Sequence, residues 1–266
     1  MSGDWTIDQD WPGYQAAEHA VWDTLYARQT NLLPGRACDA FLSGLRALNL
    51  GTGGIPKFEQ INRDLERLTG WQVVAVPGLV PDAVFFDHLA NRRFPAGRFI
   101  RKPDQLDYLQ EPDVFHDLFG HVPMLTDPVF ADYMVAYGEG GLRARGRGQL
   151  HNLARLYWYT VEFGLLATSE GLRIYGAGIV SSRAETQFAL TDPRPRRLAF
   201  DLERIMRTPY RIDDFQDIYF AVPSLDALRA ATQENFDALY QRLVLSSDLD
   251  LDANLPSDRL LSPMPQ

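Results

Sequence analysis

The sequence predicts a mostly α-helical protein with a few short β-strands, an α+β fold formed by a single domain. Apolar residues recur at helical spacing through most of the 266 residues, whereas runs typical of strands are few and short. No strand–helix alternation and no internal repeat is present. A chain of this length with 45% hydrophobic and 23% charged residues suits one large domain. We expect residues 1–245 to form it and residues 246–266, rich in Ser, Asp and Pro, to form a loosely docked tail.

Glycine, proline and capping residues separate the helical patterns. Asp127 and Pro128 are typical of an N-cap and a first helical position, and Ser182 with Glu185 has the composition of a capping box. The pattern is strongest between residues 149 and 168. Helices are predicted at residues 14–33, 41–48, 56–70, 81–89, 128–137, 149–168, 198–206 and 225–243.

Short β-branched or aromatic runs predict the strands. The best candidate is Trp71–Val76, and further extended pieces are expected at Phe99–Arg101, Leu172–Tyr175 and Ile218–Phe220. These pieces allow one or two minor strand pairs. The glycine-rich residues 51–54 lack the Lys-Ser/Thr of a phosphate loop, so we interpret them as a turn.

Composition excludes several classes of protein. A net charge of −9 argues against nucleic-acid binding, because a phosphate-binding surface is basic. Cys38 is the only cysteine, so no disulfide framework or thiolate metal site can form within one chain. The amino terminus lacks a basic and apolar leader, and no apolar run approaches the roughly 18 residues that span a membrane. We therefore expect a cytoplasmic protein with neither a membrane nor a nucleic-acid partner.

Two of the five histidines, His116 and His121, form the first candidate for a functional site. On a regular helix their spacing would place the two side chains about 140° apart, too far for one metal ion. Gly120 and Pro123 predict instead that the helix ends near Phe119 and that Gly120 turns His121 back toward His116. From the spacing alone, a shared metal and two structural histidines are equally good interpretations. The other three, His19, His88 and His151, are expected on the surface or in the core.

Glu162 is the candidate for a third ligand. Within the predicted helix its neighbours on one face are Trp158, Leu165 and Leu166, and a carboxylate among apolar side chains is costly unless it is paired or bound to a metal. The alternative is an internal Arg or Lys partner. Two His and one Glu are the composition of a facial triad, which leaves positions open on a non-haem Fe(II).

Three blocks of sequence carry a specific resemblance. Glu111–Pro123 (EPDVFHDLFGHVP) resembles the iron-binding signature of the pterin-dependent aromatic amino acid hydroxylases, and Tyr157–Leu165 (YWYTVEFGL) and Tyr175–Ser182 (YGAGIVSS) are similar to two further blocks of that family in the same order. The resemblance runs from about residue 16 to residue 243. It is strongest to bacterial members that act on phenylalanine, and it implies the catalytic domain of that family.

The resemblance implies a role for each matching residue. His116, His121 and Glu162 would hold Fe(II). Arg101, held by Asp113, would bind the carboxylate of the amino acid. The residues implied to meet the pterin are Phe85, Gly78, Leu79, Val80, Tyr157 and Asp117. Those implied to shape the slot for the substrate ring are Trp158, Phe163, Gly178 and Ser181. Glu185 and Tyr210 are implied to support these side chains without contacting the substrate.

The chain departs from the family pattern at two positions. Leu109 stands where animal members usually carry Thr, which puts one substrate contact in doubt, and Asp117 replaces the more common Glu with a shorter side chain. Animal members also carry a regulatory domain before the catalytic one and a tetramerising helix after it. We find no room for either here, and therefore expect a monomer without phenylalanine allostery.

The implied activity is a monooxygenase that converts L-phenylalanine to L-tyrosine with O2 and a tetrahydropterin as cosubstrates. The apolar Ile212 lies near a position where tyrosine-specific members carry an acid, which argues against tyrosine. Tryptophan hydroxylation is the alternative within the family, although Trp158 stands where that group often has Phe. Two alternatives come from other classes. One is a zinc hydrolase that uses the same His and Glu residues, and the other is a helical binding protein without enzymatic activity.

Overall fold

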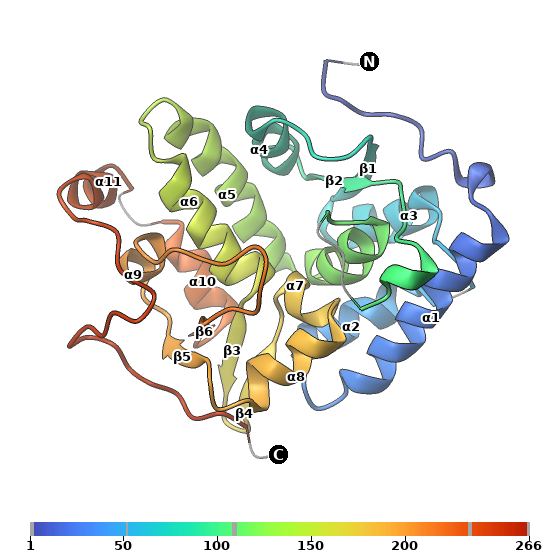
Figure 1. Ribbon diagram of the computed structural model, residues 1–266. Helices are drawn as coiled ribbons and strands as arrows, with labels where there is room; N and C mark the ends of the chain where they lie inside the picture. Colours follow the sequence, from blue (N-terminus) through green and yellow to red (C-terminus); the bar gives the residue numbers. More distant parts are fainter. Residues whose placement is uncertain (1–2, 52, 108–110, 234–235, 265–266) are drawn as a thin grey trace.

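The computed structural model describes residues 3–51, 53–107, 111–233 and 236–264, and most of these are helical, as the sequence predicts (Figure 1). None of the helices in these residues is long and apolar enough to cross a membrane. The α-helices are α1 (Ala16–Leu32), α2 (Asp39–Leu48), α3 (Phe58–Thr69), α4 (Asp82–Ala90), α5 (Pro128–Arg145), α6 (Leu150–Tyr157), α7 (Ala177–Val180), α8 (Arg183–Thr191), α9 (Leu202–Met206), α10 (Leu225–Ala231) and α11 (Phe236–Val244).

The strands form two small sheets. In the first, β1 and β2 are parallel; the second has the order β4-β3-β6-β5, in which only the β3–β4 pair is antiparallel. Every residue of β6 is buried, as expected of an interior strand that reads as a continuous apolar run. The strands are β1 (Gln72–Val76), β2 (Arg93–Gly97), β3 (Leu165–Thr168), β4 (Gly171–Ile174), β5 (Arg196–Ala199) and β6 (Ile218–Val222).

An aromatic cluster in the core holds the segment that carries the two candidate histidines. Phe115 and Phe119 are fully buried and stack on each other with ring centroids 4.9 Å apart. Trp22 of α1 meets the first ring edge-on, and Phe41 of α2 meets the second. Burying side chains of this size stabilises the fold by roughly 1.5–3 kcal/mol each. Helices α1 and α2 therefore hold the segment with His116 and His121 in place through these ring contacts.

Glycines allow α4 and α5 to approach closely. A Cβ atom on Gly138 would lie 2.5 Å from the backbone nitrogen of Ala90, and one on Gly141 would lie 2.1 Å from the Phe86 ring. Asp127 caps α5 as predicted, because its Oδ1 accepts hydrogen bonds from the N–H groups of Val129 and Phe130. This packing sets the position of α4, which carries Phe85.

Three predicted helices have other boundaries in the structure. The one predicted at residues 149–168 consists of α6, a π-helical turn η5 (Trp158–Glu162) and strand β3, so the prediction is wrong after residue 162. The helix predicted at 198–206 begins at Leu202 and follows β5, and the one predicted at 225–243 is divided between α10 and α11. Apolar runs of this length fit a strand or a buried helix equally well, which explains the first two errors.

The strand predictions were incomplete. Of the expected pieces, Trp71–Val76, Leu172–Tyr175 and Ile218–Phe220 correspond to β1, β4 and β6, whereas Phe99–Arg101 is not part of a strand. Strands β2, β3 and β5 were missed. Strand β2 contains Pro95 and small residues, which are uncommon in strands, and the apolar residues of β3 fit the helical pattern that precedes them.

The tail after residue 245 contacts the body of the protein at several points, whereas the sequence predicted loose docking. Leu260 forms a β-bridge with Leu198, and the Leu261 N–H donates to the carbonyl of Arg197. Asp258 forms an ion pair with Arg204 whose side chains are 9% and 2% exposed. The Arg204 guanidinium also donates to the carbonyl of Ala253 in the tail. The division into a 1–245 domain and a tail stays a prediction.

We predict that Asp258→Ala lowers the free energy of unfolding by about 3–5 kcal/mol, because the buried guanidinium of Arg204 would lose its counter-charge. Chemical denaturation measures this. The matched control is Asp64→Ala, which removes an exposed ion pair with Arg67 and is expected to cost less than about 1 kcal/mol. Equal losses in the two variants would contradict the importance of the buried pair.

Candidate active site

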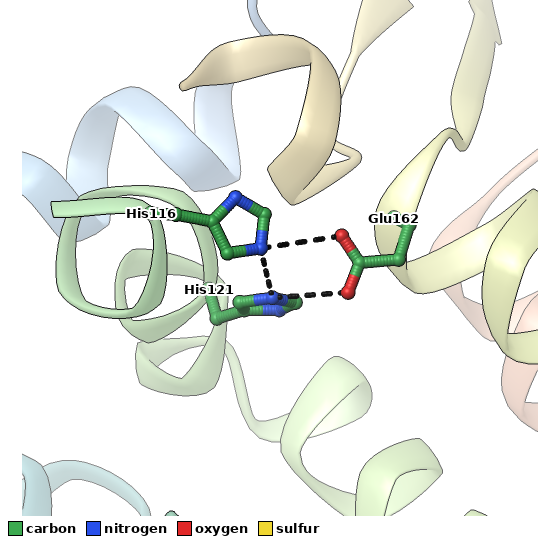
Figure 2. Close-up of side chains that lie close together, drawn as sticks. All are labelled: His116, His121 and Glu162. Carbon is green, nitrogen blue, oxygen red and sulfur yellow. Dashed lines mark hydrogen bonds and ion pairs between the residues drawn. The ribbon is translucent and has the colours of Figure 1, made fainter. Parts of the chain in front are cut away.

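His116, His121 and Glu162 point toward one another from two segments of the chain (Figure 2). The Nε2 atoms of the histidines are 3.1 Å apart, and the Glu162 carboxylate oxygens lie 3.5 Å from Nε2 of His116 and 3.2 Å from Nε2 of His121. The potential ligand atoms all lie within 4.8 Å of one another. Among the described residues this is the single cluster of three or more His, Cys, Asp or Glu with such a geometry.

A π-helical turn, η3 (His116–His121), solves the spacing problem of the two histidines. In a π-helix the hydrogen bond joins residues five positions apart, so residue i+5 returns close to residue i. The predicted helix end at Phe119 is therefore wrong, and Gly120 has no left-handed backbone. Gly120 is needed for space instead, because a Cβ there would lie 3.0 Å from the carbonyl oxygen of Ala177.

A hydrogen bond at Nδ1 of His116 turns its Nε2 toward His121 and Glu162. The hydroxyl of Ser181 donates to the carbonyl of Ala177 at 2.7 Å, so its oxygen accepts the proton of His116 Nδ1 at 3.0 Å. In the neutral ring the lone pair then lies on Nε2, which faces Glu162. His121 is positioned by packing, with its ring centroid 4.8 Å from that of Phe94.

The charges of the cluster suit a metal ion. Burial alone would raise the pKa of Glu162, but the neighbouring imidazoles of His121 and His116 outweigh this and hold it well below its ordinary value. Burial lowers the pKa of His121 and thus favours the neutral ring that can act as a ligand. Two imidazole nitrogens and a carboxylate are a donor set that divalent transition metals accept, so these residues fit such an ion.

A series of aromatic rings leads from α4 to this cluster. The half-buried Phe85 meets Tyr157 edge-on with centroids 5.6 Å apart, and Tyr157 lies 6.3 Å from the ring of His121. Asp117 is buried next to His116, and its Oδ2 accepts a hydrogen bond from the Gly97 N–H at 2.7 Å. Burial raises the pKa of Asp117 to about 7.

The Gly78–Val80 loop follows β1, and its central Leu79 is 76% exposed. This loop leads from the β1–β2 sheet to the start of α4, so it adjoins the helix that carries Phe85.

Arg101 and Asp113 form a buried, bidentate ion pair. Nε and Nη2 of Arg101 donate to the two carboxylate oxygens of Asp113 at 2.8 and 2.9 Å. Asp113 also accepts from the backbone N–H of Arg101 and from that of His116, at 2.9 and 3.0 Å. These bonds keep the pKa of Asp113 below its ordinary value, although burial alone would raise it. One carboxylate therefore connects the arginine to the first residue of η3.

Trp158 lies at the centre of a second aromatic group. Its ring stacks on Tyr210 with centroids 4.2 Å apart and an interplanar angle of 16°, and Phe163 lies 5.0 Å away on the same helix–strand junction. Gly178 packs against this group, because a Cβ there would lie 2.8 Å from the Phe163 ring. The structure thus brings together Trp158, Phe163 and Gly178, three of the four residues implied for a ring-binding slot, and the slot itself stays a prediction.

Comparison with known proteins identifies the family. Residues 9–249 match the model of the biopterin-dependent aromatic amino acid hydroxylases. The chain belongs to this family. It is 68% identical over 259 residues to the phenylalanine-4-hydroxylase of Caulobacter vibrioides, covering 97% of this chain and 88% of that protein.

Two crystal structures of phenylalanine hydroxylase from Chromobacterium violaceum are also similar. One holds iron(III) and the oxidised cofactor 7,8-dihydrobiopterin; it has 54% identity and a TM-score of 0.94, covering 98% of this chain and 94% of that one. The other holds iron and phenylalanine; it has 52% identity and a TM-score of 0.94, covering 98% and 95% of the two chains. The fold of this hydroxylase family is therefore shared over almost the whole chain.

Two polar residues next to the candidate site, Tyr219 and Gln216, were not predicted from the sequence. Tyr219 of β6 donates a short hydrogen bond from its hydroxyl to the buried carboxylate of Glu185, and the side chain of Gln216 accepts from Nε1 of Trp158 at 3.0 Å. The serine of the predicted capping box, Ser182, does accept from the Glu185 N–H. No local pattern could have paired residues more than 30 positions apart.

The remaining predicted residues lie outside the cluster. His88 is fully buried, with Nε2 donating to the Asp4 carbonyl, while His19 Nδ1 accepts from the Ile55 N–H and His151 is exposed. All three fit the surface or core roles expected of them. Leu109 lies outside the described residues.

We predict that Glu185 makes the protein less stable as pH rises from about 4.5 to about 7. Burial raises the pKa of Glu185 to about 7 from 4.5, so within this window the folded protein binds more protons than the unfolded chain. The loss is about 3 kcal/mol. In Glu185→Gln, the free energy of unfolding should fall less between pH 5 and pH 8 than in the parent. The exposed control, Glu170→Gln, should follow the parent, and identical pH profiles for both variants would contradict the assignment.

Proposed function

We propose that this chain is a monooxygenase that hydroxylates L-phenylalanine to L-tyrosine, using Fe(II), O2 and a tetrahydropterin. Membership of the hydroxylase family supports this proposal, as do the iron, dihydrobiopterin and phenylalanine bound by its relatives from Chromobacterium violaceum. The observation that carries it is the convergence of His116, His121 and Glu162, which places two imidazole nitrogens and a carboxylate within 4.8 Å of one another.

His116, His121 and Glu162 would hold the iron, a donor set that leaves coordination positions open for water and O2. When iron and a reduced pterin are bound, they supply the activation of O2 that no side chain can supply. The protein orients the reactants and keeps the site dry. Ser181 fixes the tautomer of His116, and the half-buried aromatic residues Tyr157, Trp158 and Phe163 would limit the access of bulk water.

We assign the pterin to the side of the cluster that faces α4. Phe85 offers an aromatic face for the flat pterin ring, and Tyr157 lies between it and His121. The backbone groups of Gly78, Leu79 and Val80 would meet polar atoms at the pterin edge. Asp117, with its pKa raised to about 7 by burial, would face the pterin through solvent.

We assign phenylalanine to the side lined by Arg101 and Trp158. The guanidinium would bind the substrate carboxylate, because Asp113 holds its orientation and its fork matches a carboxylate. Trp158, Phe163, Gly178 and Ser181 would enclose the ring, and Tyr210 would support Trp158 by stacking. The apolar Ile212 lies near a position where tyrosine-specific members carry an acid, which favours phenylalanine over tyrosine.

The remaining expectations concern partners and location. L-phenylalanine is proposed as the small-molecule substrate, and the net charge of −9 supports the absence of a nucleic-acid partner. A monomeric state, the absence of a membrane partner and a cytoplasmic location stay predictions.

Purified protein with added Fe(II) and tetrahydropterin is expected to form tyrosine from phenylalanine. Glu162→Ala should bind iron roughly 100-fold or more weakly and lose turnover, because one ligand of the site is gone. Metal analysis and product chromatography measure both effects. Glu170→Ala, which removes an exposed carboxylate, serves as the control.

Three results would count against the proposal. Full iron occupancy and turnover in Glu162→Ala would contradict the assignment of Glu162 as an iron ligand. Preferential binding of zinc together with hydrolytic activity would favour the zinc hydrolase. Hydroxylation of tryptophan but not phenylalanine would change the substrate and leave the metal site intact.

Arg101→Lys is predicted to raise the KM for phenylalanine by roughly tenfold, with a smaller change in kcat, because lysine keeps the charge but loses the fork. Steady-state kinetics at saturating pterin measure the effect. Arg98→Lys, a nearby exposed arginine, is the control. An unchanged KM in Arg101→Lys would show that the carboxylate binds elsewhere.

A further inference from the structure

Gln216 is a buried polar residue, 2% exposed, in the loop that leads from Tyr210 to β6. Its side-chain amide makes hydrogen bonds on both ends. Nε2 donates to the carbonyls of Arg211 and Asp214, at 2.8 and 3.4 Å. Oε1 accepts from Nε1 of Trp158 at 3.0 Å and from the backbone N–H of Arg211 at 3.3 Å.

These partners allow only one orientation of the amide. If the group were rotated by half a turn, Nε2 would face two N–H donors and Oε1 would face two carbonyl oxygens. Four hydrogen bonds would be lost in a buried place, where unpaired polar groups are costly. The oxygen is therefore committed to Trp158. An indole N–H is also the feature that distinguishes Trp from Phe at that position.

The main chain of Gln216 is held as well. Its backbone N–H interacts with the buried carboxylate of Glu185, which also accepts the hydroxyl hydrogen of Tyr219. The anchor for Trp158 thus rests on α8 and on β6, an interior strand whose residues are all buried. A side chain held at both ends has little freedom to follow the motion of its partner.

We propose that Gln216 is a positioning residue, which fixes the indole plane of Trp158 and links it to the loop of residues 211–214. This inference rests on the proposed function and deepens it, since Trp158 is assigned to the ring slot. The indole has Tyr210 on one face, so a fixed Nε1 sets both the tilt of the ring and its distance from the slot. The Trp158 side chain that encloses the substrate ring then cannot move independently of residues 211–214.

The test is Gln216→Met, which keeps the length of the side chain and removes all its strong hydrogen bonds. In the spectrum of 15N-labelled tryptophan indoles, recorded without iron, the Trp158 resonance should shift and its hydrogen exchange should quicken about tenfold. The resonance is assigned with Trp158→Phe. The indoles of Trp22 and Trp11, which donate to the carbonyls of Leu50 and Ile55, are internal references that should not move.

Kinetics provide the second measurement. Gln216→Met should raise the KM for phenylalanine about tenfold with unchanged iron content, but less than twofold in a Trp158→Phe background, because the two residues act through one contact. Asn152→Leu is the matched control. It removes another buried amide, which donates to the Met206 carbonyl, and should leave both the Trp158 resonance and the KM unchanged.

An unmoved Trp158 resonance in Gln216→Met, or additive effects on KM with Trp158→Phe, would overturn the proposal. If Gln216→Met does not fold, Gln216→Glu replaces it. At a pH at which its carboxylate is ionised, this variant keeps an oxygen against the indole but cannot donate to the loop, so the resonance should stay while KM rises, and an unchanged KM would overturn the proposal. If the parent forms no tyrosine, the proposed function fails while the indole spectrum still tests the contact.

Discussion

The site depends on holding two imidazole rings and a carboxylate close together in the core. His116 and His121 face each other through Nε2 atoms 3.1 Å apart, and the carboxylate of Glu162 lies within 3.5 Å of both. Two regular α-helices would separate these groups. The wider turns η3 and η5 bring them together instead, and each is anchored by buried aromatic or apolar neighbours that oppose relaxation to a regular helix. Packing elsewhere in the core offsets the free energy that the two irregular turns cost.

A buried ion pair connects the cluster of His116, His121 and Glu162 to Arg101. Asp113 is fully buried and has four hydrogen-bond donors, three from Arg101 and one from the backbone of His116. The same carboxylate therefore sets the orientation of the guanidinium and the start of η3. Because both groups share one acceptor, a shift of either is opposed by the other. The orientation of the Arg101 guanidinium and the start of η3 are thus coupled through one buried carboxylate rather than set by two independent side chains.

The residues of the metal cluster could be predicted because their chemical types are informative and their blocks are specific. The backbone that joins them could not, since no local signal separates a π-helical turn from an α-helix or a helix end. Glu162 was assigned neighbours at Leu165 and Leu166 that belong to a strand. Its unusual setting was recognised correctly, although the geometry behind it was wrong. Gln216 and Tyr219 could not be predicted from the sequence because their roles arise only from tertiary contacts.

Glycine contacts explain why the three sequence blocks act as one unit. A Cβ on Gly164 would lie 2.1 Å from the carbonyl oxygen of Thr160, and a Cβ on Gly176 would lie 2.5 Å from that of Glu162. Gly176 has an ordinary backbone with φ of −66°, so it is required for space and not for conformation. Gly120 meets Ala177 in the same way. Helix α7 can therefore lie directly against both ligand-bearing turns, and a methyl group at any of these contacts would move a turn that carries a ligand.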